Sequence, residues 1–152
     1  MAKINFDIPT RFDEEQAREG VWFEVEDEHD QLWGEFKLAY LDGDAPDVKK
    51  LRTKLKAKYA KDIRLGKLDQ DKVAMEIFLS YVLLDWRKVK AGGKAVPFSK
   101  EAAEAYFEMP QVKSFAWPVL LQYAGDVRWY NDKAAEQGVD PVTDKDETLG
   151  NS

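Results

Sequence analysis

The sequence predicts an α+β protein that is mainly α-helical, with a small antiparallel β-hairpin near the N-terminus. Residues 73–86, which begin with Val73 and end with Trp86, have ten large apolar or aromatic side chains in fourteen positions. Apolar and polar residues alternate across residues 20–41, and apolar positions recur three and four residues apart across residues 46–137. We therefore expect one globular domain over residues 1–138, whose helices pack around a central apolar helix.

The central helix is expected over residues 73–86. This stretch is too short to span a bilayer, which takes about 20 apolar residues. A helix that is apolar on nearly every face has to be surrounded by other elements. Charged residues at Asp85, Arg87 and Lys88 end the apolar run. We expect the other elements to pack against this helix.

The β-hairpin is predicted by the alternation of its side chains. Val21, Phe23 and Val25 share one face of a strand, the polar residues 27–31 form a turn, and residues 32–41 return. An isolated hairpin is only marginally stable in water. Its apolar face should therefore pack on the helices that follow.

The two ends of the chain have different patterns. Ile4, Phe6 and Ile8 alternate with polar residues, which predicts a short edge strand that ends at Pro9. Residues 139–152 are polar and acidic without an apolar period, which predicts a disordered tail.

Start and stop signals bound the predicted helices. Pro46 is suited to the first helical position, and Gly66 is suited to a left-handed C-terminal cap. Asp69 and Ser99 are suited to N-caps, and the second should begin a helix over residues 100–108. The first helix has an apolar stripe that should face the core, formed by Val48, Leu51, Leu55, Tyr59 and Ile63.

Charge is distributed unevenly along the chain. The net charge is −6, yet residues 49–67 hold nine Lys and Arg against one acidic residue. We interpret this segment, which begins with Lys49 and ends with Lys67, as a solvated helix face. The alternative is a nucleic-acid-binding module, although no known nucleic-acid motif accompanies the cluster.

The sequence contains no recognisable chemistry for catalysis. The chain has no cysteine, and its only histidine, His29, lies in the polar hairpin turn. Glycine-rich phosphate loops, calcium loops and zinc motifs are all missing. We predict no catalytic, cofactor-binding or metal-ligating residues and therefore no enzyme, while a dispersed carboxylate site stays open. Residues 1–10 lack the apolar run of a signal peptide, so we expect a soluble cytosolic protein.

Aromatic residues are the candidates for partner binding. Trp22 and Trp33 are predicted on the hairpin face opposite the core, unless a one-residue register slip buries Trp33. Trp117, Trp129 and Tyr130 lie in the C-terminal helical part. Coverage by another segment, or ordinary helix packing, is the alternative for all five.

Several segments between residues 21 and 130 occur in the order found in a known family. They are Gly34-Glu35-Phe36-Lys37-Leu38, a basic helix, the turn Gly66-Lys67-Leu68-Asp69, the apolar segment ending Leu84-Asp85-Trp86, and Val96-Pro97-Phe98-Ser99-Lys100-Glu101 before an alanine-rich helix. Together they resemble the tail assembly chaperones of long-tailed, siphovirus-like bacteriophages.

This resemblance implies a non-enzymatic factor of the host cytoplasm that is absent from the mature virion. It implies binding to the tape measure protein and recruitment of tail tube protein during tail morphogenesis. Self-association is a separate expectation for this chain. The resemblance also implies a longer frameshifted product in many members. The family has no catalytic residues to carry over, and Asp85, Trp86, Pro97 and Phe98 are implied to be structural. Neither a membrane nor nucleic acid is an expected partner.

The main rival is a structural tail or connector subunit that remains in the virion. Its sequence would have the same soluble core and the same lack of catalytic motifs. Only its presence in assembled particles would distinguish it from a chaperone.

Overall fold

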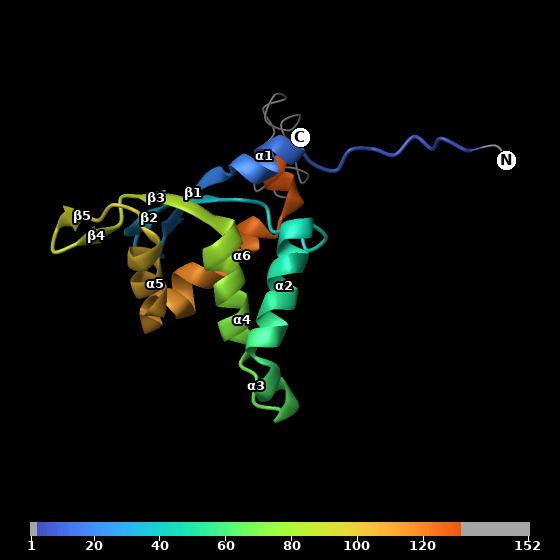
Figure 1. Ribbon diagram of the computed structural model, residues 1–152. Helices are drawn as coiled ribbons and strands as arrows, with labels where there is room; N and C mark the ends of the chain where they lie inside the picture. Colours follow the sequence, from blue (N-terminus) through green and yellow to red (C-terminus); the bar gives the residue numbers. More distant parts are fainter. Residues whose placement is uncertain (1–2, 132–152) are drawn as a thin grey trace.

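The computed structural model describes residues 3–131, and it confirms the α+β prediction (Figure 1). The predicted acidic tail, residues 139–152, lies outside the described residues. A three-stranded antiparallel sheet lies at one end of the molecule, and helices α4, α5 and α6 lie below it in the view of Figure 1.

The predicted hairpin forms the first two strands of that sheet. Strands β1 (Val21–Glu26) and β2 (Leu32–Leu38) pair as expected, and β3 (Leu83–Arg87) adds to the free side of β2. Phe23 pairs with Phe36, which pairs in turn with Trp86. These three buried side chains form an aromatic row across the face of the sheet that meets the helices.

The prediction of one helix over residues 73–86 is wrong for its last four residues, 83–86. Helix α4 (Gln70–Ile77) continues into a π-helical turn, η1 (Phe78–Val82), and the chain then extends into β3. Pairing with β2 places Trp86 beside Phe36 and lets its indole Nε1 donate to the Val96 carbonyl at 2.8 Å. A short apolar run is compatible with a buried helix and with a buried strand, so the presence of a partner strand decides which of the two forms.

Other helix signals in the sequence are confirmed by the structure. Helix α2 (Pro46–Lys58) starts with its proline, Asp69 caps α4, and Ser99 caps α5 (Lys100–Glu108). The C-terminal part comprises the π-helical turn η2 (Val112–Ala116), α6 (Trp117–Ala124) and the 3-10 turn η3 (Val127–Tyr130).

Three further features differ from the predictions for residues 46–137. Between β3 and α5 the chain forms a small hairpin of β4 (Lys90–Ala91) and β5 (Lys94–Ala95). The first basic helix is interrupted at Tyr59 and resumes as α3 (Ala60–Arg64). Ile63 then lies 46% exposed instead of facing the core.

The N-terminal segment contradicts its prediction as well. Ile4, Phe6 and Ile8 form no strand within the described part of the chain and are exposed. The N-terminal segment extends away from the body in Figure 1. Helix α1 (Glu14–Glu19), which the sequence pattern did not indicate, follows with Asp13 as its N-cap. Alternation of apolar and polar residues is not sufficient for a β-strand, because the strand also needs a neighbouring strand with which to form hydrogen bonds.

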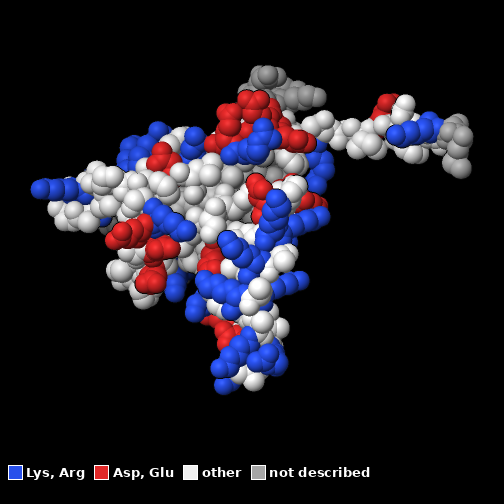
Figure 2. Space-filling view, viewed as in Figure 1, with Lys and Arg blue, Asp and Glu red and all other residues white. Residues whose placement is uncertain are grey.

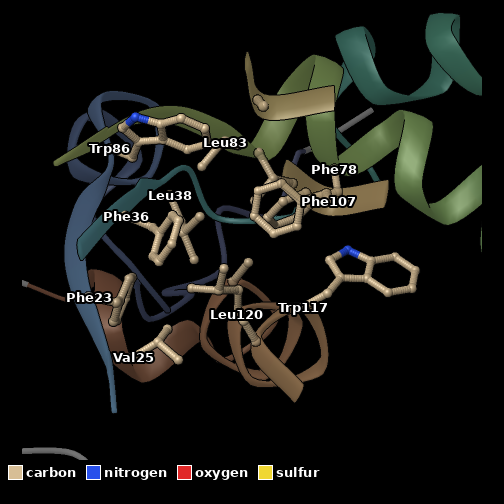
Figure 3. Close-up of a cluster of buried hydrophobic side chains, with 14 of the residues drawn as sticks. Phe23, Val25, Phe36, Leu38, Phe78, Leu83, Trp86, Phe107, Trp117 and Leu120 are labelled. Carbon is tan, nitrogen blue, oxygen red and sulfur yellow. The ribbon is translucent and has the colours of Figure 1, made fainter. Parts of the chain in front are cut away.

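The main core lies between the sheet and the helices, as the close-up in Figure 3 shows. Phe36, Phe78 and Phe107 contact one another through two edge-to-face ring pairs, with centroids 6.1 and 5.1 Å apart. A second and smaller cluster joins α2 to α4 and has three buried members, Leu55, Tyr59 and Ile77.

Candidate partner-binding surfaces

Trp22 lies on the outer face of the sheet and stacks beneath a charged side chain. The guanidinium carbon of Arg87 is 4.0 Å from the centre of the Trp22 ring. Arg87 also pairs with the buried carboxylate of Glu35, to which Lys88 Nζ donates at 2.8 Å. Hydrogen bonds from Lys88 and Arg87 lower the pKa of Glu35. Trp22 is therefore half-buried within a charged network.

Trp33 faces the core side of the hairpin, as the register-slip alternative required. Val25 pairs with Gly34 and Glu26 with Leu32, so Trp33 is an extra residue in the ladder. Its ring lies 5.0 Å from that of Phe115, and its Nε1 donates to Asp27 at 3.1 Å. A bulge of this kind redirects one side chain, so Trp22 and Trp33 have separate environments.

Trp117 and Tyr130 are core residues, and their burial leaves them little or no surface to present to a partner. Trp117 is 7% exposed, and Tyr130 is fully buried. The hydroxyl of Tyr130 donates to the Leu38 carbonyl at 3.1 Å, and burial raises its pKa. Both therefore hold the C-terminal helices against the body of the protein.

Trp129 retains some exposed surface beside strand β1. Its ring packs edge-on against Phe23 and Tyr123, with centroids 5.5 and 5.3 Å apart. With Trp22 it borders a shallow hollow of about 490 Å³, whose lining residues are Trp22, Phe23, Glu24, Glu26, Tyr123 and Trp129. We call this hollow the β1 hollow.

The second candidate surface is an apolar groove of about 300 Å³ between α2, α3 and α4. Its lining residues are Arg52, Leu55, Lys56, Tyr59, Ile63, Leu68, Gln70, Val73 and Ile77. We call it the α2–α4 groove. The helices around it project from the body, and Figure 2 shows Lys and Arg side chains concentrated over them. An apolar floor thus lies within a basic surround.

One polar cluster fixes the two walls of the α2–α4 groove to each other. Lys58 Nζ lies 2.8 Å from Glu76 Oε1, and the Tyr59 hydroxyl donates to the same oxygen. Burial alone would raise the pKa of Glu76, but the hydrogen bonds from Lys58 and Tyr59 outweigh it and lower the pKa. These contacts connect the C-terminal end of α2 to α4 beside the groove.

Neither surface contains a cluster of metal-ligating side chains within the described residues. Among residues 3–131, no three His, Cys, Asp or Glu side chains are placed to hold a metal ion. In the same part of the chain, no helix is long and apolar enough to cross a membrane. What the two surfaces do offer is apolar and charged area for contact with another chain.

Comparison with known protein families identifies the chain's origin. Residues 44–140 match the model of the YdaY prophage protein family, which is more than half of the sequence. The chain belongs to this family. It is therefore a phage-derived protein. No curated protein and no solved structure matched the sequence.

The matched region of this YdaY family member contains the entire α2–α4 groove. The hairpin of β1 and β2 and the N-terminal segment lie before it. Sequence reasoning missed the groove, because spacing assigned Leu55, Tyr59 and Ile63 to one buried stripe. The available signal was the density of basic residues around that stripe, which left few side chains able to cover Ile63.

Proposed function

We propose that this YdaY family member is a non-enzymatic tail assembly chaperone. In this role it works in the host cytoplasm, binds the tape measure protein, helps recruit tail tube subunits and is absent from the mature virion. The observation that carries the proposal is the α2–α4 groove, with its apolar floor and basic surround. Grooves of this kind bind one face of an amphipathic helix.

The dimensions and charge of the groove support a helical partner. Its wall α2 has 13 residues, which makes it about 20 Å long at 1.5 Å per residue. A partner helix of about four turns could therefore lie along it. Arg52 and Lys56 line the groove, so carboxylates flanking the partner's apolar face would be favoured. Tape measure proteins are expected to be long amphipathic helices, which supply such faces repeatedly.

The order of segments that resembles tail assembly chaperones supports the proposal independently. These segments extend from the hairpin to α5, on both sides of the groove. The phage origin of the chain is consistent with this role. The groove adds a surface on which the role can be tested.

The test is co-expression of the full chain with the tape measure protein of the same prophage, followed by affinity capture. We expect the tape measure protein to co-purify, and Ile63→Asp to abolish capture by placing a charge in the groove. Leu65→Asp is the matched control, because Leu65 is similarly exposed at 52% and lies outside the lining of the groove. Failure of the unmodified chain to capture the tape measure protein, or equal loss in both variants, would refute the proposal.

Nucleic-acid binding by residues 49–67 is the second candidate, and the basic surface in Figure 2 favours it. Such binding would weaken steeply as salt increases. A gel shift with double-stranded DNA at low salt tests it, with Lys54→Glu and Lys61→Glu as variants. Against it, Lys58 is paired with Glu76 and the whole chain is acidic.

The structural tail subunit is distinguished by where the protein is found. Mass spectrometry of purified virions should detect a tail or connector subunit at a fixed number of copies. The chaperone proposal expects none above the background of host proteins.

A further inference from the structure

The most exposed apolar side chains of the described residues lie on the N-terminal segment. Ile4, Phe6 and Ile8 are 70%, 73% and 79% exposed, whereas other large exposed apolar residues reach 52% at most. We call residues 3–9 the N-terminal arm. All three side chains lie on one side of an extended chain, because they are spaced two residues apart. The arm is thus an extended segment that pairs with no strand among the described residues.

The sheet of the same protein has an edge that suits such a segment. Strand β1 lies at the edge of the order β1-β2-β3, and its ladder hydrogen bonds are with β2. An edge strand presents a row of backbone donors and acceptors that another strand can pair with. The β1 hollow lies along this edge and has the rings of Tyr123 and Trp129 in its wall.

We propose that the N-terminal arm adds as a fourth strand to β1 of a second copy of this chain. Ile4, Phe6 and Ile8 then lie toward Tyr123 and Trp129 in the β1 hollow. Each copy has one arm and one β1 edge, so a reciprocal exchange pairs both arms and closes as a symmetric dimer.

The anchoring of the arm favours a second copy over its own body. The Phe12 ring packs on Tyr40 with centroids 4.9 Å apart, and the Asp13 amide donates to the Tyr130 carbonyl at 2.8 Å. The chain is fixed at these residues, and the arm leaves from them away from the body (Figure 1). Its N-terminal Lys3 is also opposite in charge to the exposed Glu24 and Glu26 of β1.

Molar mass in solution gives the first test. Light scattering of the full chain should give twice the monomer mass of 17.5 kDa. The variant with Ile4→Ser, Phe6→Ser and Ile8→Ser should give the monomer mass, because it keeps the backbone of the arm but removes the apolar contacts. The matched control changes the other face, as Lys3→Ser, Asn5→Ser and Asp7→Ser, and should remain mostly dimeric. A monomeric unmodified chain, or a dimer that the first variant leaves intact, overturns the proposal.

A second test uses the absence of native cysteine. One variant has Asn5→Cys, on the face of the arm opposite Ile4, Phe6 and Ile8, and the other has Glu24→Cys on the outer face of β1. Mixing the two under oxidising conditions should give a disulfide-linked heterodimer, and Glu104→Cys on α5 in place of Glu24→Cys should give little. If Asn5→Cys and Glu24→Cys link only when they are in one chain, the arm folds onto its own body and the proposal is wrong. Capture of the tape measure protein is measured separately, so the arm proposal can fail while the chaperone proposal stands.

Discussion

Two regions of the molecule differ in how completely they bury their apolar side chains. The body comprises the three-stranded sheet with α5 and α6, and the projection comprises α2, α3 and α4 around the α2–α4 groove. In the body, the aromatic row Phe23, Phe36 and Trp86 is covered by α5, α6 and the turns around them. In the projection, the core cluster has only three buried members, while Ile63 and Leu65 remain about half exposed. The apolar side chains of the body are covered by its own elements, whereas the projection retains exposed apolar surface for a partner. Stability should therefore depend on the body, and binding on the projection.

The largest expected effect is from truncating the centre of the body. Phe36 is fully buried and contacts the rings of Trp86, Tyr106 and Phe107. Phe36→Ala should lower the free energy of unfolding by about 3–5 kcal/mol, as measured by urea denaturation. A loss below about 1 kcal/mol would mean that the sheet and helices do not share one core.

A smaller loss is expected from the same kind of change in the projection. Leu55 is buried, but it belongs to the three-residue cluster and also borders the open groove. Leu55→Ala should cost about 2–3 kcal/mol, at the low end for a buried leucine. Hydrogen exchange should show faster exchange in α2 and α4 while the sheet stays protected. Equal acceleration in the sheet would show that the two regions unfold together.

The ion pair on the outer face of the body gives a pH-dependent prediction. Because the folded-state pKa of Glu35 is depressed, its contribution is complete above the unfolded-state pKa and is lost as the pH falls through the folded-state value. At pH 7, Glu35→Gln should cost about 1–3 kcal/mol, through weaker hydrogen bonds with Arg87 and Lys88. The difference from the unmodified protein should vanish in acid below the folded-state pKa.

Glu24→Gln is the control for the Glu35 prediction. Glu24 lies opposite Glu35 in the ladder and is exposed, so removing its like charge should leave stability unchanged or slightly higher. A difference for Glu35→Gln that persists unchanged at low pH would rule out the charge as its cause.

The smallest expected effect is at the tip of the projection. Gly66 has φ = +68°, and a Cβ built there meets no atom within 4 Å. Gly66→Ala should therefore cost about 1 kcal/mol from backbone strain alone, as read from the thermal midpoint. Gly34→Ala in the body should cost more, because its Cβ would lie 2.9 Å from Phe36 Cζ and Val89 Cγ2.

Predictions from the sequence succeeded where the cause lies within a few residues. Pro46, Asp69 and Ser99 set helix starts, because a fixed φ or a capping oxygen acts on the next turn. They failed for the strand at residues 83–87, whose partner β2 lies about 50 residues earlier. Of the five candidate aromatics, the structure leaves Trp22 and Trp129 beside one hollow and places Trp117 and Tyr130 in the core.

The sequence by itself determined the α+β class, the hairpin, the helix caps and the basic segment, because propensity, capping and alternation are local properties. Tertiary structure decided that residues 83–87 leave the helix for the sheet, that Trp33 turns inward at a bulge, and that Ile4, Phe6, Ile8 and Ile63 stay exposed. The reason is that burial and strand pairing each depend on two segments that meet in space. The pattern of one segment indicates which of its side chains are suited to burial. The neighbouring segments decide whether those side chains contact the core or water.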